Sequence, residues 1–389
     1  MIGTPAVAAP TTGTILNAGS ATAVAGSYIV VLKDSAVGGT AGHAKAAVAS
    51  RATTLAERYR ATVRDVWGDA LNGFSVHATE KTAKQLAADP AVAYVEQDGT
   101  VQATTTQSNP PWGLDRIDQQ SLPLSNSYSY TTTGAGVTAY IIDSGIRTTH
   151  ADFGGRAIHG YDAIDNALPA DDCNGHGTHT AGTVGGTTYG VAKNVTLVAV
   201  RVLDCAGSGT WAQAIAGINW VTSNHQAGQP AVANMSLDGA PNASLNTAVA
   251  NSIADGITYA VAAGNSNADA CNYSPASVPT AITVGATMSN DARSSFSNWG
   301  ICVDLYAPGT GILSAWSTSN TATNLISGTS MASSHVAGAA ARVLQANPAL
   351  SPAQVSAALL VCCRVFPPWP WPGPCPCPDP TMLHIGQER

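Results

Sequence analysis

Residues 326–342 read ISGTSMASSHVAGAAAR, and this stretch decides how the chain folds. From Met331 onward the run is rich in alanine and valine with small residues at helical spacing, which predicts a helix through to Leu344. Ser330 therefore lies where a glycine-containing turn enters a helix N-terminus, whose unpaired N–H groups favour a developing negative charge. A serine hydroxyl in that position suits a nucleophile, which needs a base to take its proton and a third group to orient the base.

Two upstream motifs offer these partners. The motif NGHGTHTAG at 174–182 places His176 between two glycines, and AYIIDSGI at 139–146 ends a strongly β-forming run on Asp143. A carboxylate at the carboxyl end of a buried strand lies where open α/β sheets carry their chemistry. Esterases and lipases of the α/β-hydrolase kind use the order Ser, Asp/Glu, His and a Gly-x-Ser-x-Gly motif. The order Asp143, His176, Ser330 and the sequence of 328–332 both disfavour that class.

In this order the three motifs resemble those of the subtilase family of serine endopeptidases, in its proteinase K and aqualysin-like branch. The resemblance runs from about Trp112 to about Leu360. It implies an α/β fold, namely a subtilisin-like parallel-sheet protease domain with helices on both faces. It also implies peptide-bond hydrolysis by an Asp-His-Ser triad through an acyl-enzyme, in a secreted, extracellular protein. The alternative function is a catalytically silent complex of enzyme and propeptide, which an aberrant C-terminus or an uncut propeptide would leave.

The composition narrows the class of protein further. The chain has 389 residues, 45% hydrophobic and 11% charged, which is enough for two domains with a large core. Its formal net charge is −7 and it has no lysine or arginine cluster, so we expect neither a nucleic-acid nor a membrane partner. Residues 1–25 lack the positive start and apolar core of a signal peptide, and we expect a leader remnant or disorder there. We expect a monomer that acts on proteins and peptides.

Residues 26–103 are predicted to form a small separate domain. Expected strands at 28–33, 62–67, 73–78 and 92–96 and expected helices at 44–60 and 80–88 give a βαββαβ order, which indicates an α+β ferredoxin-like unit. Its place before the larger domain resembles that of the subtilase propeptide, which acts as an intramolecular inhibitor. The polar run 99–111 is typical of a linker. We place a cut that the enzyme makes in itself between Val101 and Gln107.

Residues 104–361 are expected to form the peptidase domain, because strand-like and helix-like runs alternate as in a mainly parallel sheet. The expected strands are 137–142, 196–202, 231–236, 258–262 and 281–284, and the expected helices are 179–184, 211–224, 245–254, 334–346 and 352–360.

Residues 362–389 are predicted to be a disordered, proline- and cysteine-rich tail. Prolines recur at nearly every second position from Pro367 to Pro380, which excludes a helix or a central strand. Our hypothesis is a frameshift near Val361. The same prolines give poor geometry for a zinc site at Cys362, Cys363, Cys375 and Cys377.

The resemblance assigns further residues to the site. Asn265 resembles the side chain of an oxyanion hole, with the backbone N–H of Ser330 as the second donor. By itself, Gly264-Asn265 would favour a turn residue instead. Two backbone edges and an aromatic residue resemble a groove that holds extended substrate as an added strand. The substrate-binding residues implied are Gly207, Ser208, Gly209, Trp211, Ser236, Leu237, Asp238, Gly239, Ala262, Ala263 and Gly264.

Two positions depart from the family pattern. Asp238 stands where these enzymes have glycine, and its carboxylate would bias the cleft toward basic side chains, whereas the resemblance implies large apolar or aromatic ones. Ser334 stands where the family has proline in the first helical turn after the nucleophile, and we expect a cost of about 1 kcal/mol or less. His150, His179 and His335 are interpreted as structural residues.

Four cysteines fall in the peptidase domain and allow three pairings. The resemblance selects Cys173 with Cys205 and Cys271 with Cys302, each worth about 3 kcal/mol, and it implies a cis bond between Ser274 and Pro275. It also implies structural calcium, bound by two sets of hard oxygen ligands. The first set is Asp115, Asp118, Gln119 and Ser125, and the second is Asp304 with the carbonyl groups of Pro279 and Ala281.

Overall fold

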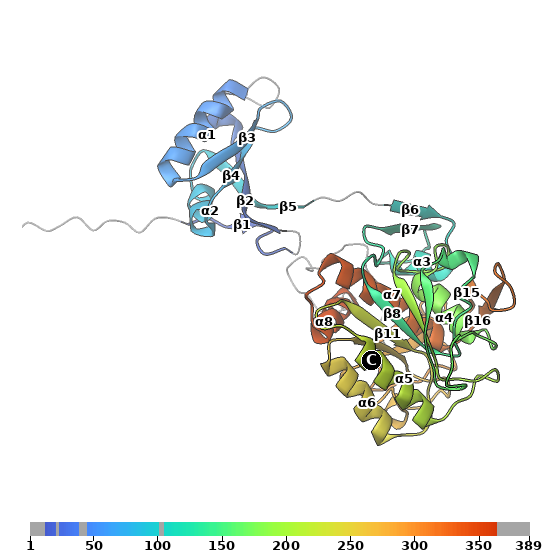
Figure 1. Ribbon diagram of the computed structural model, residues 1–389. Helices are drawn as coiled ribbons and strands as arrows, with labels where there is room; N and C mark the ends of the chain where they lie inside the picture. Colours follow the sequence, from blue (N-terminus) through green and yellow to red (C-terminus); the bar gives the residue numbers. More distant parts are fainter. Residues whose placement is uncertain (1–11, 21–22, 39–44, 101–104, 364–389) are drawn as a thin grey trace, which may run out of the picture. The chain divides into compact units, whose positions relative to one another are not determined.

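The computed structural model describes residues 12–20, 23–38, 45–100 and 105–363 (Figure 1). The chain divides into two compact units between Gln102 and Ala103. The first is called the N-terminal unit below, and the second the C-terminal unit. Residues 364–389 of the predicted tail and residues 101–104 of the predicted cleavage region lie outside the described residues.

The N-terminal unit has a five-stranded sheet with the order β1-β5-β2-β4-β3. Its strands are β1 (Ile15–Leu16), β2 (Ala23–Leu32), β3 (Thr62–Trp67), β4 (Gly73–His77) and β5 (Val92–Gly99), and its helices are α1 (Lys45–Tyr59) and α2 (Glu80–Ala87). The pairs β2–β4, β2–β5 and β3–β4 are antiparallel. The predicted ferredoxin-like order is therefore confirmed, and side chains such as Val30, Leu55 and Phe74 fill the core.

The strand β1 corrects the expectation that residues 1–25 are only a leader remnant or disordered. It pairs in parallel with β5, joining Ile15 to Val95 in register. The side chain of Ile15 is buried in the core of the N-terminal unit, and the Gly13 N–H donates to the Lys84 carbonyl. The short run was missed because two residues carry no periodicity.

The C-terminal unit is built on a seven-stranded sheet with the order β14-β13-β12-β11-β8-β10-β9, in which every pair is parallel. The strands are β8 (Thr138–Asp143), β9 (Ala157–Asp162), β10 (Thr196–Arg201), β11 (Ala231–Met235), β12 (Thr258–Ala262), β13 (Ile282–Thr287) and β14 (Leu305–Pro308). The strand order reverses direction at β8, between β10 and β11. The carboxyl end of β8 is therefore the position where such sheets bind ligands, and Asp143 is its last residue.

Helices cover both faces of this sheet, as predicted (Figure 1). They are α3 (Trp112–Ile117), α4 (His176–Gly185), α5 (Trp211–Asn224), α6 (Ala243–Ala254), α7 (Thr329–Ala346) and α8 (Pro352–Cys363). Successive side chains of a strand point to opposite faces. In β8, Ala139 and Ile141 enter the core shared with α4, α7 and α8, while Tyr140 and Ile142 enter the core shared with α5 and α6. Burial on both faces explains the continuous apolar runs of the sequence.

Several helix boundaries differ from the prediction; the helix α4, for example, begins at His176 instead of residue 179. The helix α7 begins at Thr329, so Ser334 is its sixth residue and lies in the second turn instead of the first. The nucleophile candidate thus belongs to the helix itself, because Gly328 is the N-cap. The helix α8 continues to Cys363, past the boundary expected at 361/362.

Two short antiparallel strand pairs and 3-10 turns complete the fold. The strands β6 (Thr105–Ser108) and β7 (Ser127–Tyr130) pair antiparallel, as do β15 (Ile312–Ala315) and β16 (Thr323–Ile326). The 3-10 turns are η1 (Asp34–Ala36), η2 (Ala151–Phe153) and η3 (Ala270–Asn272). Since β6 lies inside the run 99–111, the linker prediction is wrong for 105–108.

Candidate active site

Ser330 lies in the first turn of α7, and its backbone is held firmly. Its carbonyl oxygen accepts hydrogen bonds from the hydroxyls of Ser236 (3.0 Å), Ser333 (3.0 Å) and Ser334 (2.8 Å). Its own hydroxyl donates one longer bond, 3.3 Å, to the Ser236 carbonyl. Two hydrogen bonds, one donated by each serine, thus join the end of β11 at Ser236 to the helix at Ser330. The nucleophile candidate therefore faces the end of β11.

His176 is the first residue of α4, and Asp143 fixes its ring. The Nδ1 atom lies 2.8 and 3.0 Å from the two oxygens of Asp143. The carboxylate is fully buried and also accepts the Ser144 N–H (2.7 Å) and the Thr180 hydroxyl (3.3 Å). Because Asp143 can only accept, Nδ1 carries the proton, and Nε2 is left as the acceptor.

Asp172 holds the backbone around His176, and the sequence analysis missed it. Its Oδ1 accepts the Gly175 N–H (2.8 Å), the Asn174 N–H (3.0 Å) and the Ser144 hydroxyl (2.9 Å). Its Oδ2 accepts the backbone N–H and hydroxyl of Thr178. An acidic residue just before a helix start is the signal that could have identified it, because carboxylates there satisfy unpaired N–H groups.

The pKa of His176 results from opposing effects. Burial by itself lowers the pKa of this imidazole, but the charge and hydrogen bond of Asp143, aided by Asp172, outweigh it, and the net pKa is raised. The imidazolium is therefore stabilised, as a base that must hold a proton during a reaction requires.

The three side chains do not form one continuous hydrogen-bonded chain. No hydrogen bond joins His176 Nε2 to Ser330 Oγ among the described residues, because the serine hydroxyl is directed at the Ser236 carbonyl. Catalytic hydrogen bonds are often long or poorly aligned before substrate binds. The structure thus brings Asp143 and His176 together, and it directs the Ser330 hydroxyl at the carbonyl of Ser236, a residue that lines the same cleft as His176.

Asn265 follows β12, and its amide has a defined direction. Its Oδ1 accepts the backbone N–H of Thr329 (2.8 Å) and the Thr329 hydroxyl (3.0 Å). The oxygen must face these donors, so Nδ2 points elsewhere and is available to a ligand. The Thr329 hydroxyl also accepts the Gly264 N–H (3.1 Å). Thr329 therefore orients Asn265, a role that the Gly-Thr-Ser motif alone did not reveal.

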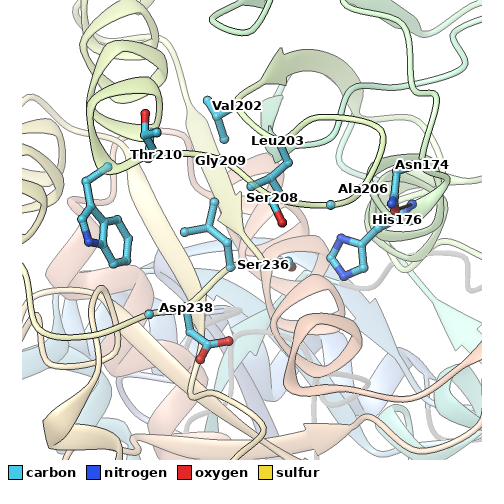
Figure 2. Close-up of a pocket in the computed structure, with 15 residues that line it drawn as sticks. Asn174, His176, Val202, Leu203, Ala206, Ser208, Gly209, Thr210, Ser236 and Asp238 are labelled. Carbon is cyan, nitrogen blue, oxygen red and sulfur yellow. Dashed lines mark hydrogen bonds between the residues drawn. The ribbon is translucent and has the colours of Figure 1, made fainter.

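A cleft of about 820 Å³ opens beside His176 (Figure 2). One wall is formed by residues 202–211, and the other by residues 236–239 at the end of β11. The predicted substrate-binding residues that line it are Gly207, Ser208, Gly209, Trp211, Ser236, Leu237, Asp238 and Gly239. Ala262, Ala263 and Gly264 are not among the lining residues; they are buried, with Gly264 next to the Asp238 carboxylate.

The first wall of the cleft is stabilised covalently and by hydrogen bonds. A disulfide joins Cys173 to Cys205, the pair expected from the resemblance, and Asn174 Nδ2 donates to the Cys205 carbonyl. Asp204 Oδ1 accepts the N–H groups of Ala206 and Ser208. This edge of the cleft is therefore attached to the loop that carries His176.

Comparison with known proteins shows the family to which the chain belongs. Residues 134–362, more than half of the chain, match the model of the subtilase family, and residues 27–104 match the model of peptidase inhibitor I9. The chain belongs to the subtilase family. It is a serine proteinase with an inhibitor domain at its N-terminal side, so the predicted family, fold and enzyme class are confirmed.

The relatives of this subtilase cover much of its length. It is 59% identical over 300 residues to an extracellular serine proteinase of Thermus sp. (strain Rt41A), which covers 77% of this chain and 73% of that protein. It is 54% identical over 308 residues to alkaline serine exoprotease A of Vibrio alginolyticus, covering 78% of this chain and 57% of the relative. The crystal structure of a cold adapted subtilisin-like serine proteinase matches with a TM-score of 0.64 and 56% identity, over 65% of this chain and 91% of that one.

The first predicted calcium set of this subtilase contains an anionic oxygen that suits a cation. Asp118 Oδ1 is buried without a hydrogen-bond partner, while its Oδ2 accepts the Ser129 N–H. Burial, opposed by that N–H and reinforced by the nearby Asp115 carboxylate, raises the pKa of Asp118 to about 6. Asp115 is buried too and accepts the N–H and hydroxyl of Ser125. A cation bound here would relieve the repulsion between the two carboxylates, so Asp115 and Asp118 are suitable ligands for calcium.

Other parts of the two predicted calcium sets are occupied by protein contacts. Gln119 Oε1 accepts the Ser125 N–H, and Asp304 Oδ2 accepts the Thr283 N–H at 2.8 Å, beside the segment that carries Pro279 and Ala281. Burial raises the pKa of Asp304. Among the described ranges, no three histidine, cysteine or acidic side chains gather around one point. Backbone and amide oxygens would have to complete either site, as calcium permits.

The remaining assignments concern residues away from the cleft. Cys271 is joined to Cys302, and the Ser274–Pro275 bond is cis, both as expected from the resemblance. His150, His179 and His335 are buried and bond to the carbonyls of Ala322, Ile312 and Met331. Burial lowers the pKa of His179 and of His335 to about 4, so both are neutral structural residues. In the part of the chain that the structure describes, no helix is both long and apolar enough to cross a bilayer.

Proposed function

We propose that this subtilase is a secreted endopeptidase that hydrolyses peptide bonds through Asp143, His176 and Ser330. The proposal depends above all on one observation: the His176 imidazole, bonded to buried Asp143, opens onto a cleft whose Ser236 carbonyl receives the Ser330 hydroxyl. An Asp–His pair is not sufficient evidence, since His225 and Asp255 form one on the surface at 2.9 Å. The cleft and the serine at a helix N-terminus distinguish the first pair.

In the proposed reaction, Ser330 Oγ turns from the Ser236 carbonyl toward His176 Nε2 and attacks the scissile carbonyl carbon. Nε2 takes the hydroxyl proton as the new bond forms, and Asp143 stabilises the resulting imidazolium. The same nitrogen then gives the proton to the leaving amine, which leaves an ester between substrate and Ser330. Water, activated by the neutral imidazole, hydrolyses this acyl-enzyme and regenerates the serine.

Negative charge on the substrate oxygen requires donors placed beforehand. Asn265 Nδ2 is one donor in this proposal, because Thr329 holds the amide oxygen away from the reacting atoms. The N–H of Ser330 is the second, since the first N–H groups of a helix have no intrahelical acceptor. Donors fixed in advance need no reorganisation when the charge develops.

The N-terminal unit acts, in this proposal, as an inhibitor in the same chain until the enzyme removes it. We narrow the expected cut to the stretch between Val101 and Thr105, because Thr105–Ser108 is engaged in the β6–β7 pairing. The name of the Thermus relative supports an extracellular location. Peptides would be bound between the two walls of the cleft as an added strand.

Calcium is proposed as a structural ion held by Asp115 and Asp118. Its contribution would be to neutralise two buried carboxylates close together. We expect EDTA to lower the melting temperature by about 5 °C or more, and to have a smaller effect on Asp118→Asn. An unchanged melting temperature would contradict this part of the proposal.

The function is tested by treating the full recombinant chain with a serine-directed phosphonate and measuring its mass and N-terminal sequence. We expect one label on Ser330 and a new N-terminus between 102 and 105, together with cleavage of casein. Ser330→Ala should stay unlabelled, uncut and inactive, with turnover reduced by about 10⁶-fold. Heat-denatured chain controls for labelling that does not require the folded site.

Two results would count against the proposal. A cut that persists in Ser330→Ala means that this serine does not cleave the chain. A processed chain that neither reacts with the phosphonate nor degrades casein supports the catalytically silent alternative.

A further inference from the structure

Asp238 is a charged residue in the cleft that the proposed reaction does not use. Of the described residues that line the cleft, it is the single acidic one, and none is lysine or arginine. Its side chain is accessible to solvent, and its carboxylate is drawn at the lower edge of the labelled residues, below Ser236, in Figure 2. A ligand that enters the cleft would therefore meet one fixed negative charge.

The position of Asp238 relates it to the reacting atoms. It follows Ser236 by two residues, and the Ser236 carbonyl receives the Ser330 hydroxyl at 3.3 Å. On the other side, Asp238 Oδ2 lies 3.2 Å from the point where a Cβ on Gly264 would stand, and Gly264 precedes Asn265. The carboxylate thus lies beside Gly264, on a residue two positions after Ser236.

Asp238 also differs from the other carboxylates of this region because no described residue donates a hydrogen bond to it. Asp143, Asp172 and Asp204 each accept two or more. The walls of the cleft remove enough water to raise the pKa of Asp238. A carboxylate that is partly desolvated and unpaired is a ready acceptor for a cationic ligand.

The substrate itself indicates which ligand this is. When a peptide carbonyl lies at Ser330 Oγ with its oxygen toward Asn265, the side chain of that residue starts two bonds from the reacting carbon. We expect that side chain to lie along residues 236–239, because these residues line the cleft and Ser236 of this wall bonds the Ser330 hydroxyl. The space beside Asp238 is therefore offered to the residue that is cut.

We propose that Asp238 makes this subtilase prefer lysine or arginine as the residue whose carbonyl is attacked. The inference rests on the proposed function, and it specifies the substrate class of the same site. The glycine that the family resemblance implies at this position would offer no charge, so the preference belongs to this chain's own residue.

The test uses matched peptide anilides that differ only in the residue before the cut: lysine, arginine, norleucine or phenylalanine. Lysine and norleucine have nearly the same shape, so the ratio of their kcat/KM values isolates the charge. We expect the processed enzyme to favour lysine over norleucine by about ten- to a hundredfold. Asp238→Asn, which keeps the shape, should reduce that ratio to about one. Asp238→Gly should do the same.

The active-site concentration of each variant is measured with the phosphonate, so misfolded protein does not enter the ratio. A ratio near or below one in the unmodified enzyme overturns the inference, as does a high ratio that Asp238→Asn leaves unchanged. Rapid cleavage after phenylalanine or norleucine alone would keep the endopeptidase proposal and reject this one. No cleavage of any anilide, together with no phosphonate label, would reject the endopeptidase proposal itself.

Discussion

The two sides of the proposed active site differ in what is fixed. On the side of His176, Asp143 holds the ring, and Asp172 holds the backbone before and after it. On the side of Ser330, three hydroxyls hold the carbonyl, while the nucleophilic hydroxyl has one bond of 3.3 Å. The base is therefore oriented in advance, and the nucleophile has a fixed backbone with a side chain that can turn.

This difference shows which part of the site must change when substrate binds. The ring of His176 is held by charged hydrogen bonds in a buried setting, which are costly to break. In the proposed reaction, the Ser330 hydroxyl exchanges its one weak bond to Ser236 for a bond to His176 by rotation about a single bond. Mutations on the His176 side remove a prearranged group and should therefore lower kcat strongly. Mutations of the hydroxyls that hold the Ser330 backbone should lower kcat less.

Among variants that keep the nucleophile, the largest effect is expected from Asp143→Asn, which tests the fixed side. The substitution keeps the size of the side chain, but it removes the charge and replaces one of the two acceptor oxygens at Nδ1 by a donor NH₂ group. We expect kcat to fall by about 10⁴-fold, measured with the preferred anilide. Asp255→Asn is the matched control, because it alters a similar His–Asp pair with His225 away from the cleft. A loss below tenfold in Asp143→Asn, or equal losses in both variants, would contradict the assignment.

A smaller effect is expected from Asn265→Ala, which removes the donor on the Ser330 side. We expect kcat to fall by about 10²–10³-fold with little change in KM, because the bond forms in the transition state. Thr329→Val should reproduce part of this loss by removing one of the two hydrogen bonds that hold the amide oxygen of Asn265, whereas Thr329→Ser keeps the hydroxyl and the activity. A rise in KM at constant kcat would instead place Asn265 in substrate binding.

Much of the fold could be predicted where local signals agreed. The helix 211–224 has the predicted ends, because Thr210 and Gln213 form a capping box. The strand 258–262 also has the predicted ends, since its apolar run is bounded by glycines at 256 and 264. The edge strands β9 and β14 were missed. The first contains His159 and Gly160, and the second ends in Pro308, all weak strand formers.

The site could be predicted in its residue types but not in its connections. Asp143, His176 and Ser330 were predicted as a triad from the three motifs that contain them and from the order of these motifs along the chain. The roles of Asp172 and Thr329 depend on hydrogen bonds to Ser144 and Asn265, which folding brings near from distant positions. The direction of the Ser330 hydroxyl depends on the Ser236 carbonyl in the same way. No periodicity records such contacts.

The pH profile sharpens the view of His176 as a prearranged base. Only the neutral imidazole accepts a proton, so activity falls as the pH decreases through the pKa of His176. Burial lowers this pKa and Asp143 raises it, with a net increase. We therefore expect the acid limb of kcat/KM to have its midpoint above about pH 6.5, with about tenfold loss per pH unit below it. A midpoint at or below that value would contradict the proposed balance.

The same group should affect stability in the opposite direction. A pKa that is raised in the folded state stabilises the protein below the unfolded value of about 6.5, and this stabilisation is lost as the pH rises through the folded pKa. The free energy of unfolding of the inactive Ser330→Ala chain is measured by denaturant titration at pH values on both sides of the pKa of His176. Self-digestion is absent in this variant, so stability is measured separately from activity. His176 should thus favour activity at high pH and stability at low pH.

The smallest effect is expected from Ser334→Ala, which tests how firmly the nucleophile's backbone is held. The hydroxyl of Ser334 donates to the Ser330 carbonyl at 2.8 Å, but those of Ser236 and Ser333 remain when it is removed. We expect a loss of about 1 kcal/mol in the free energy of unfolding and about a twofold change in kcat. Thr183→Ala is the control, since its hydroxyl bonds the His179 carbonyl four residues back, away from the nucleophile. If both variants lose the same stability but only Ser334→Ala changes kcat, the hydroxyl of Ser334 positions Ser330. A tenfold fall in kcat would instead mean that the backbone of the nucleophile is less firmly held than the three bonds indicate.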